Sequence, residues 1–137
     1  MDIILQGGSV VLPNNKIEEL DIGICDSKIC AIGNLSRSSS QKIINIKNLL
    51  VIPGAIDTQV HFREPGLTHK EDIFHGTMGA VLGGVTSIFE MPNTKPPTTN
   101  FKELSNKFKI AEKNGFCNFS FFIGATRENI QEINELE

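Results

Sequence analysis

The sequence contains no apolar run that approaches the ~20 residues needed to cross a lipid bilayer. Its N-terminus, MDIILQGGSVV, has no basic leader followed by an apolar core and a small-residue cleavage site. Lysine and arginine are scattered, and the formal net charge is -3, so we expect neither nucleic acid nor an anionic membrane as a partner. No P-loop, GxSxG or nucleotide-binding glycine signature occurs. These absences leave the cytoplasm as the expected compartment.

Cysteine is also scarce, with three residues in 137. Cys25 and Cys30 are too widely spaced for a CxxC redox or zinc pair. We therefore expect both of them, and Cys117, to be reduced residues that pack. With 39% hydrophobic residues, the chain is long enough to bury a core.

The first third of the chain has the pattern of closely spaced short strands with no helical period between them. Turn residues such as Asp26-Ser27 separate these strands, and that pair predicts a hairpin. The pattern is typical of a small antiparallel sheet. The predicted strands are Ile3–Leu5, Ser9–Leu12, Leu20–Cys25, Lys28–Ile32 and Lys42–Ile46.

Beyond a boundary near Asn48, predicted strands alternate with predicted helices, which favours βαβ units and a parallel sheet or barrel. The predicted strands are Leu50–Val60, Val85–Met91 and Asn118–Ile123, and the predicted helices begin at Thr68, Asn100 and Thr126.

Two of these helices show capping and packing patterns. Thr68 and Glu71 have the spacing of a capping box, as do Asn100 and Glu103. Apolar stripes predict the faces that pack on the core. They comprise Phe74, Met78, Val81 and Leu82 in the first helix and Phe101, Leu104, Phe108 and Ala111 in the second.

The stretch VIPGAIDTQVHFREPG, residues 51–66, combines a predicted buried strand with a polar face and a tight exit. Alternation places Asp57, Gln59 and His61 on one face of the strand, opposite Thr58, Val60 and Phe62. Because the carboxyl ends of parallel strands form active sites in barrels, we expect a site here and in the exit loop 92–97.

Two motifs in these loops carry a family resemblance. They closely resemble the dihydroorotases of the amidohydrolase superfamily, and they read DTQVHFREPG from Asp57 and EMPNT from Glu90. The resemblance implies an α/β fold in which residues 1–48 are part of a small β-sandwich and residues 49–137 are the first three βα units of an incomplete (β/α)8 barrel. It covers the whole chain, as the N-terminal portion of a longer protein.

The resemblance also implies a metal site, usually of zinc, held by the two histidines of Asp-x-His-x-His. Here Gln59 occupies the first histidine position and His61 the second. A carboxamide is a much weaker zinc donor than imidazole, so we expect poor zinc binding by this chain. The remaining ligands and the catalytic aspartate of the family lie on later strands, and we assign no catalytic residue. Asp57 matches the motif aspartate, for which a structural hydrogen bond is an equal interpretation.

Arg63 and Asn93 match the family positions that hold the carboxylate of the substrate. Guanidinium pairs with carboxylate bidentately, and an amide NH2 adds a neutral donor. On spacing alone, a packed His61, a solvated Arg63 and a turn-capping Asn93 are the commoner interpretations. His69 and His75 are expected at the surface.

The function implied by the resemblance is the reversible cyclisation of N-carbamoyl-L-aspartate to L-dihydroorotate in pyrimidine synthesis. We expect the chain to be inactive alone, because Gln59 replaces a ligand and the other ligands are not in the sequence. Two alternatives stay open. In the first, the chain would be a noncatalytic scaffold or regulatory subunit that pairs with another chain such as aspartate carbamoyltransferase. In the second, it would be half of a split enzyme.

Overall fold

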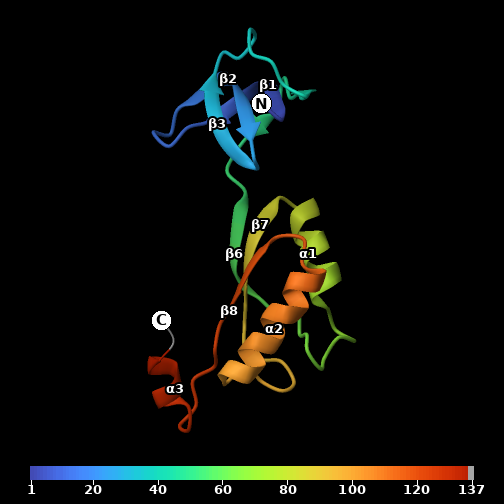
Figure 1. Cartoon of the computed structure of the whole chain (residues 1–137), viewed down its shortest axis with the longest axis vertical. Helices are drawn as coiled ribbons and strands as arrows, with labels where there is room; N and C mark the ends of the chain where they lie inside the picture. Colours follow the sequence, from blue (N-terminus) through green and yellow to red (C-terminus); the bar gives the residue numbers. More distant parts are fainter. Residues whose placement is uncertain (136–137) are drawn as a thin grey trace. The chain divides into compact units, whose positions relative to one another are not determined.

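The computed structural model describes residues 1–135 and divides into two compact units, Met1–Pro53 and the residues from Gly54 onward (Figure 1). The first unit contains strands only, and the second alternates strands and helices. The division between the units falls five residues beyond Asn48, the predicted boundary.

The first unit is a mixed sheet in the order β3-β2-β1-β4, with β5 also paired to β1. The predicted small antiparallel sheet is confirmed for β1, β2 and β3 but is wrong for β4 and β5, which run parallel to β1. Parallel pairing requires a connection that returns the chain to the same end, and the segment of residues 34–41 provides it. The bounds are β1 Ile3–Val11, β2 Ile17–Cys25, β3 Lys28–Gly33, β4 Lys42–Asn45 and β5 Leu50–Val51.

One strand, β1, replaces the two that were predicted at its position. Its pairing with β2 shifts register between Leu5 and Gly8, which is the pattern of a β-bulge. Gly7 adopts a φ of 78° within the bulge, a value that suits glycine. The bulge keeps the strand continuous where the glycine pair predicted a turn.

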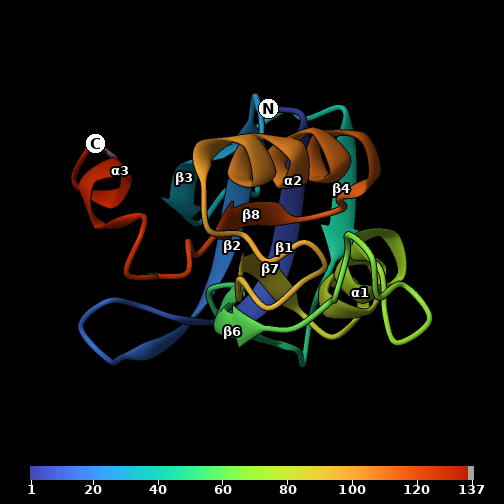
Figure 2. The same ribbon diagram turned by 90° about the horizontal axis from the view of Figure 1, so that it is seen from below.

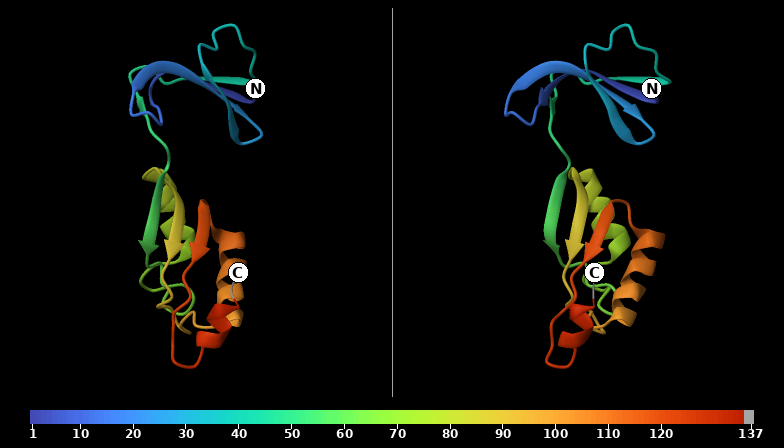
Figure 3. Two further views of the ribbon diagram at one scale, coloured as in Figure 1. Left: turned by 90° about the vertical axis from the view of Figure 1, so that its left-hand side faces the viewer. Right: turned by 60° about the vertical axis from the view of Figure 1, so that its left-hand side comes forward.

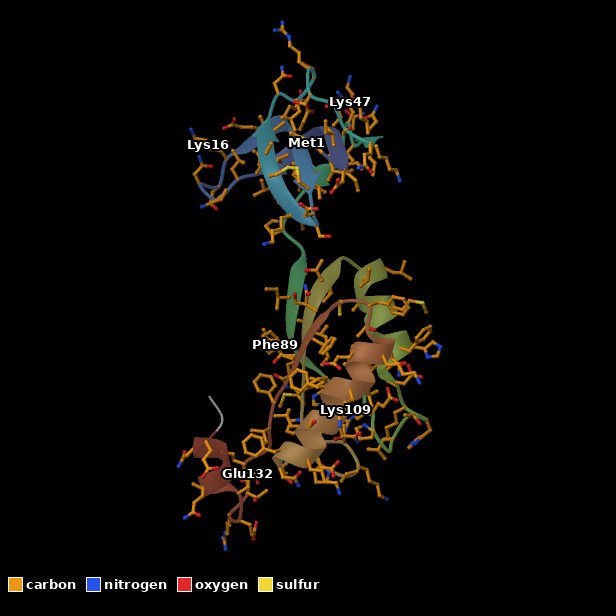
Figure 4. The ribbon with its side chains drawn as sticks, viewed as in Figure 1. Met1, Lys16, Lys47, Phe89, Lys109 and Glu132 are labelled. Atoms are coloured by element: carbon orange, nitrogen blue, oxygen red, sulfur yellow. A yellow bond between two sulfur atoms is a disulfide. The ribbon has the colours of Figure 1, made fainter. Side chains whose placement is uncertain are left out.

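The β2–β3 hairpin is confirmed, but its cysteines correct a prediction. Cys25 and Cys30 form a disulfide, which Figure 4 shows as a yellow bond, and their Cα atoms are 5.8 Å apart. The ladder runs from Cys25 opposite Lys28 to Gly23 opposite Ala31, and its register shift leaves Cys30 as an extra residue. A hairpin thus brings together two cysteines that linear spacing separates. Cys117 is free, as expected.

The second unit is a parallel sheet in the order β6-β7-β8, and its βα alternation is confirmed. Helices α1 and α2 cover the same face of this sheet, and no helix covers the other face within residues 54–135 (Figures 1 and 3). Figure 2 shows α2 lying beside β8. The bounds are β6 Ala55–Val60, α1 Ile73–Leu82, β7 Val85–Glu90, α2 Phe101–Asn114, β8 Asn118–Phe121 and α3 Ile130–Asn134.

The predicted strand Leu50–Val60 is two strands in two different sheets. Pro53 lies between β5 and β6, and proline cannot donate to a ladder. Residues 55–59 of β6 are exposed, so the expected buried strand is also wrong. The reason is topological, because β6 is an edge strand of its sheet.

The helix starts agree with prediction in one case out of three. The side chain of Asn100 caps α2 and accepts a hydrogen bond from the Glu103 N–H. Asp72, not Thr68, caps α1, because the segment of residues 67–70 forms a turn before the helix begins. Thr126 does not cap α3, since its hydroxyl accepts the Glu128 N–H instead.

The face of α1 that packs on the core is different from the predicted stripe. Ile73 and Thr77 are buried, and a ring of Phe62 lies against Gly76, which leaves no room for a side chain there. The predicted stripe of Phe74, Met78, Val81 and Leu82 is exposed. Small residues allow the helix to approach the sheet closely, and apolar periodicity alone does not detect that. In α2 the predicted face is correct for Ala111, which is buried, and for Phe108, whose ring packs on Phe119 and Phe121.

None of the helices within residues 1–135 has the length and apolar character that crossing a lipid bilayer requires.

Candidate functional site

Two loops leave the carboxyl ends of β6 and β7 and lie side by side. The Met91 N–H donates to the Val60 carbonyl at 3.0 Å, and the Lys95 N–H donates to the Pro65 carbonyl at 3.0 Å. Gly66 has a φ of 87°, and a Cβ there would lie 1.9 Å from the Lys95 carbonyl oxygen. Glycine is therefore required for the two backbones to meet.

These loops bring together three of the predicted site residues. His61 Nδ1 lies 2.8 Å from Asn93 Oδ1, and Arg63 Nη1 donates to the Asn93 carbonyl at 3.4 Å. This contact joins the imidazole of His61, at the end of β6, to the side-chain amide of Asn93 in the loop after β7. Asn93 is thus the residue through which the other two are connected.

The other two residues of the motif lie on β6, outside this cluster. Asp57 and Gln59 are exposed, and Asp57 Oδ1 accepts the Gln59 N–H at 3.0 Å. The pairing of β6 with β7 is irregular between Asp57 and Val60. The regular alternation that the sequence predicts for these side chains is interrupted at this position.

The residues present do not make up a complete metal centre. Within residues 1–135, no group of three or more His, Cys, Asp or Glu side chains is gathered closely enough to hold an ion. His61 offers one imidazole, and the carboxamide of Gln59 is a weak donor to zinc. A metal bound here would need ligands in addition to those of the described residues.

Beneath the loops lies a buried ion pair that the sequence analysis missed. Glu90 Oε2 is 2.9 Å from Lys107 Nζ, and both side chains are at most 1% exposed. Glu90 Oε1 accepts the Arg63 N–H at 3.1 Å, and Lys107 Nζ donates to the Met91 carbonyl at 3.0 Å. The available signal was the place of Lys107 on the apolar face of α2, four residues before Ala111.

Burial opposes the charge on both members of this pair. It raises the pKa of Glu90 and lowers the pKa of Lys107, while the hydrogen bond and the attraction between them act in the other direction. A buried pair of this kind persists because each charge has a partner.

Further hydrogen bonds fasten the second loop. Thr94 and Thr98 are buried, and the Thr94 hydroxyl donates to the Pro96 carbonyl at 2.9 Å. The side chain of Asn129 donates to the carbonyls of Thr99 at 2.6 Å and Gly124 at 2.8 Å. The loop is therefore anchored to the segment that follows β8.

The first loop is anchored to the start of α1. Glu64 Oε2 accepts the Ile73 N–H at 2.9 Å, and Asp72 Oδ1 accepts the His75 N–H at 2.7 Å. The hydrogen bond from this N–H lowers the pKa of Asp72, and the carboxylate of Asp72 raises the pKa of His75. His75 and His69 are both exposed, as expected.

Comparison with known proteins identifies the same family that the sequence motifs in these two loops resemble. Residues 48–133 match the model of the family described as "Dihydro-orotase-like". A dihydroorotase from Methanosarcina acetivorans is 40% identical over 124 residues, which are 90% of this chain and 26% of that protein. A dihydroorotase from Geotalea daltonii is 41% identical over 143 residues, covering 100% of this chain and 34% of that protein.

Relatives with a different name are also similar. An allantoinase from Rubrobacter xylanophilus is 36% identical over 136 residues, covering 98% of this chain and 30% of that protein. The chain thus spans about a quarter to a third of the length of these curated relatives.

Solved structures share the fold of the whole chain. The L-hydantoinase (dihydropyrimidinase) of Arthrobacter aurescens superimposes with a TM-score of 0.92 at 30% identity, over 98% of this chain and 30% of that chain. A D-hydantoinase at 24% identity gives a TM-score of 0.83 over 99% of this chain and 30% of that chain. At this identity the similarity is evidence for the fold and not for a function. The resemblance found in the sequence is therefore confirmed, and the chain belongs to the dihydroorotase-like family, corresponding to the N-terminal portion of its members.

Proposed function

We propose that this chain is the first part of a dihydroorotase-type amidohydrolase of pyrimidine synthesis. Its two loops hold the carboxylate of a cyclic amide such as L-dihydroorotate. The observation that carries the proposal is the meeting of Arg63 and Asn93, from two loops, at one end of one sheet. We call these two residues the carboxylate clamp.

The chemistry of the clamp suits a carboxylate. The guanidinium of Arg63 presents paired N–H donors that match two carboxylate oxygens. Asn93 receives the His61 ring through its amide oxygen, and the NH2 of the same amide remains a donor toward the ligand. The clamp therefore selects cyclic amides that bear an acid from those that do not.

Hydrolysis needs more than these residues supply. In amidohydrolases a bound metal lowers the pKa of water and polarises the scissile carbonyl. Within residues 1–135, the motif offers the imidazole of His61 and the weakly donating carboxamide of Gln59 and no group of three ligands, so we expect binding without turnover. We further propose that residues 49–137 are three units of a (β/α)8 barrel, whose remaining strands pair with the edge strands β6 and β8 and supply the other ligands.

Differential binding tests the proposal. We expect the chain to bind L-dihydroorotate and to bind dihydrouracil, which lacks the carboxylate, at least tenfold more weakly, as measured by calorimetry or NMR titration. Arg63→Gln should cost about 1.5–3 kcal/mol of binding free energy for dihydroorotate, since a charged hydrogen-bond donor is lost. The matched control is Arg37→Gln, which removes an exposed arginine of the first unit and should leave the affinity unchanged.

Equal affinity for the two compounds, or no effect of Arg63→Gln, would refute the clamp. Zinc-dependent hydrolysis of dihydroorotate by the purified 137-residue chain would refute the proposal that its metal centre is incomplete.

A further inference from the structure

We propose that Glu90 and Lys107 are positioning residues for the carboxylate clamp, acting through the backbones of the two loops that carry it. The inference rests on the proposed function and adds two residues that contact no ligand. It is carried by the hydrogen bonds of a buried ion pair.

Glu90 and Lys107 connect three elements to the clamp. Lys107 comes from the middle of α2 and reaches Glu90, at the end of β7, and the Met91 carbonyl, where the second loop begins. The other oxygen of Glu90 accepts the N–H of Arg63 in the first loop. One carboxylate oxygen thus accepts the Arg63 N–H, and the other forms the ion pair with the Lys107 ammonium but has no hydrogen bond, so both loops are tied to one buried charge pair.

The backbone of Arg63 needs such support. Its φ of 70° lies in the left-handed region, which side-chain-bearing residues rarely adopt. Residues held in this region persist only where the surroundings impose it, and they concentrate at functional sites. Here Glu90 accepts from the N–H of the strained residue itself, which directs the Arg63 side chain toward Asn93.

Stability alone does not account for the pair. A buried ion pair is weak evidence for stabilisation, because well-packed apolar residues of similar volume often serve as well or better. An apolar pair, however, could not accept the Arg63 N–H or donate to the Met91 carbonyl. The face of Phe121, whose centroid is 5.4 Å from Lys107 Nζ, gives the ammonium a further favourable neighbour.

Substitutions at both positions test the inference in the full 137-residue chain. The readouts are the Arg63 backbone amide and side-chain Nε signals by NMR, together with the affinity for L-dihydroorotate. Glu90→Leu should shift both Arg63 signals and weaken dihydroorotate binding roughly tenfold or more, because the acceptor for Arg63 is lost. Glu90→Gln retains a carbonyl oxygen that can accept the Arg63 N–H. The Arg63 signals should therefore stay near their original positions, and most of the affinity for dihydroorotate should be retained.

Lys107→Met leaves the Glu90 carboxylate buried without its cation and should disturb the clamp. Combining it with Glu90→Gln removes that charge, so the double variant should recover Arg63 signals and affinity relative to Lys107→Met alone. Lys109→Met is the matched control, because Lys109 is exposed on the same helix and is labelled in Figure 4.

Ile88→Val serves as the control for general destabilisation, because Ile88 is a buried apolar residue of β7 and the substitution leaves Glu90 and Lys107 unchanged. Equal effects of Ile88→Val and Glu90→Leu on Arg63 and on affinity, at matched folded fraction, would overturn the positioning role. Unchanged Arg63 signals in Glu90→Leu would overturn it as well. If Glu90→Leu does not fold, Lys107→Met and the double variant decide the matter by the same readouts. Absence of dihydroorotate binding in the unmodified chain would count against the clamp, while the Arg63 signals would still report whether Glu90 holds that residue.

Discussion

At the scale of single residues, the site depends on backbone conformations that few side chains permit. Arg63 and Gly66 both have positive φ, at 70° and 87°, within the same loop. For Arg63 a hydrogen bond from its N–H to Glu90 offsets the strain, whereas at Gly66 the absence of a side chain removes it. The close approach of the two loops therefore depends on one glycine and one carboxylate.

Gly66→Ala tests this dependence. The added methyl group would occupy the position of the Lys95 carbonyl and impose an unfavourable φ, so we expect a loss of at least about 2 kcal/mol in the free energy of unfolding. Urea denaturation followed by circular dichroism measures it. Gly79→Ala is the matched control. Gly79 lies in α1 with open space around its Cβ position, so the substitution should be neutral or stabilise by up to about 1 kcal/mol. Equal effects of the two substitutions would contradict the argument.

At the scale of elements, the start of α1 combines a cap with a titratable pair. Asp72 accepts the His75 N–H at 2.7 Å, and its other oxygen lies 2.8 Å from His75 Nδ1. The Glu64 carboxylate accepts from Ile73 in the same turn. The N-cap of α1 therefore lies at Asp72, four residues later than Thr68, and the first loop is fastened to this turn through Glu64.

The stability of α1 should depend on pH through this pair. The pKa of His75 is raised from 6.5, so its contribution is fully present below about pH 6.5 and is lost as the pH rises through the folded-state value. The pKa of Asp72 is lowered from 3.8, so its contribution is present above that value and is lost as the pH falls through the folded-state value. Stability from this pair is therefore greatest in mildly acidic solution.

An NMR titration of the His75 ring measures the effect. Asp72→Asn should bring the pKa of His75 down toward its ordinary value, because the carboxylate that holds the proton is gone. Glu128→Gln, an exposed change far along the chain, is the control and should leave the titration where it was. A His75 titration that Asp72→Asn does not move would show that the pair does not form.

At the scale of the whole molecule, the sheet of the second unit has one face without helices and two edge strands within residues 54–135. The helix-free face carries Phe89 and Phe122, whose ring centroids are 6.0 Å apart, and Phe89 is labelled in Figure 4. Phe122 is exposed and Phe89 is partly buried, and exposed apolar surface beside open strand edges is a feature of a surface that packs against further strands. This agrees with a chain that spans a quarter to a third of its relatives.

Metal binding should depend on the further strands that the proposal assigns to the barrel. The 137-residue chain is expected to retain no stoichiometric zinc after dialysis at micromolar concentration, because His61 is one imidazole without the ligands of a complete site. Gln59→His should leave this result unchanged in the chain alone, and should tighten zinc binding at least tenfold when the remaining strands are present. Elemental analysis and chelator competition measure both, with His61→Gln as the control. Stoichiometric zinc in the unmodified chain would contradict the prediction.

Much of this protein could be predicted from the sequence, because the relevant interactions are local. The βα alternation, the Asp26-Ser27 hairpin and the Asn100 cap each depend on a few neighbouring residues. The loops that follow β6 and β7 were also identified as the candidate site, since parallel strands bring their carboxyl ends to one edge.

Only the tertiary structure decided the rest, because the contacts join residues that are distant in sequence. The apolar periodicity predicted the wrong face of α1. The helix packs through the side that contains Gly76, where the Phe62 ring lies close to the backbone, and not through its larger apolar side chains. The Cys25–Cys30 disulfide depends on a bulge in pairing register, and the parallel pairing of β4 with β1 depends on the course of the connection. The Glu90–Lys107 pair is the clearest case. Lys107 lies on an apolar helix face, and its partner, the carboxylate of Glu90, is 17 positions earlier in the sequence. Because both groups are buried, each charge depends on the other for stabilisation.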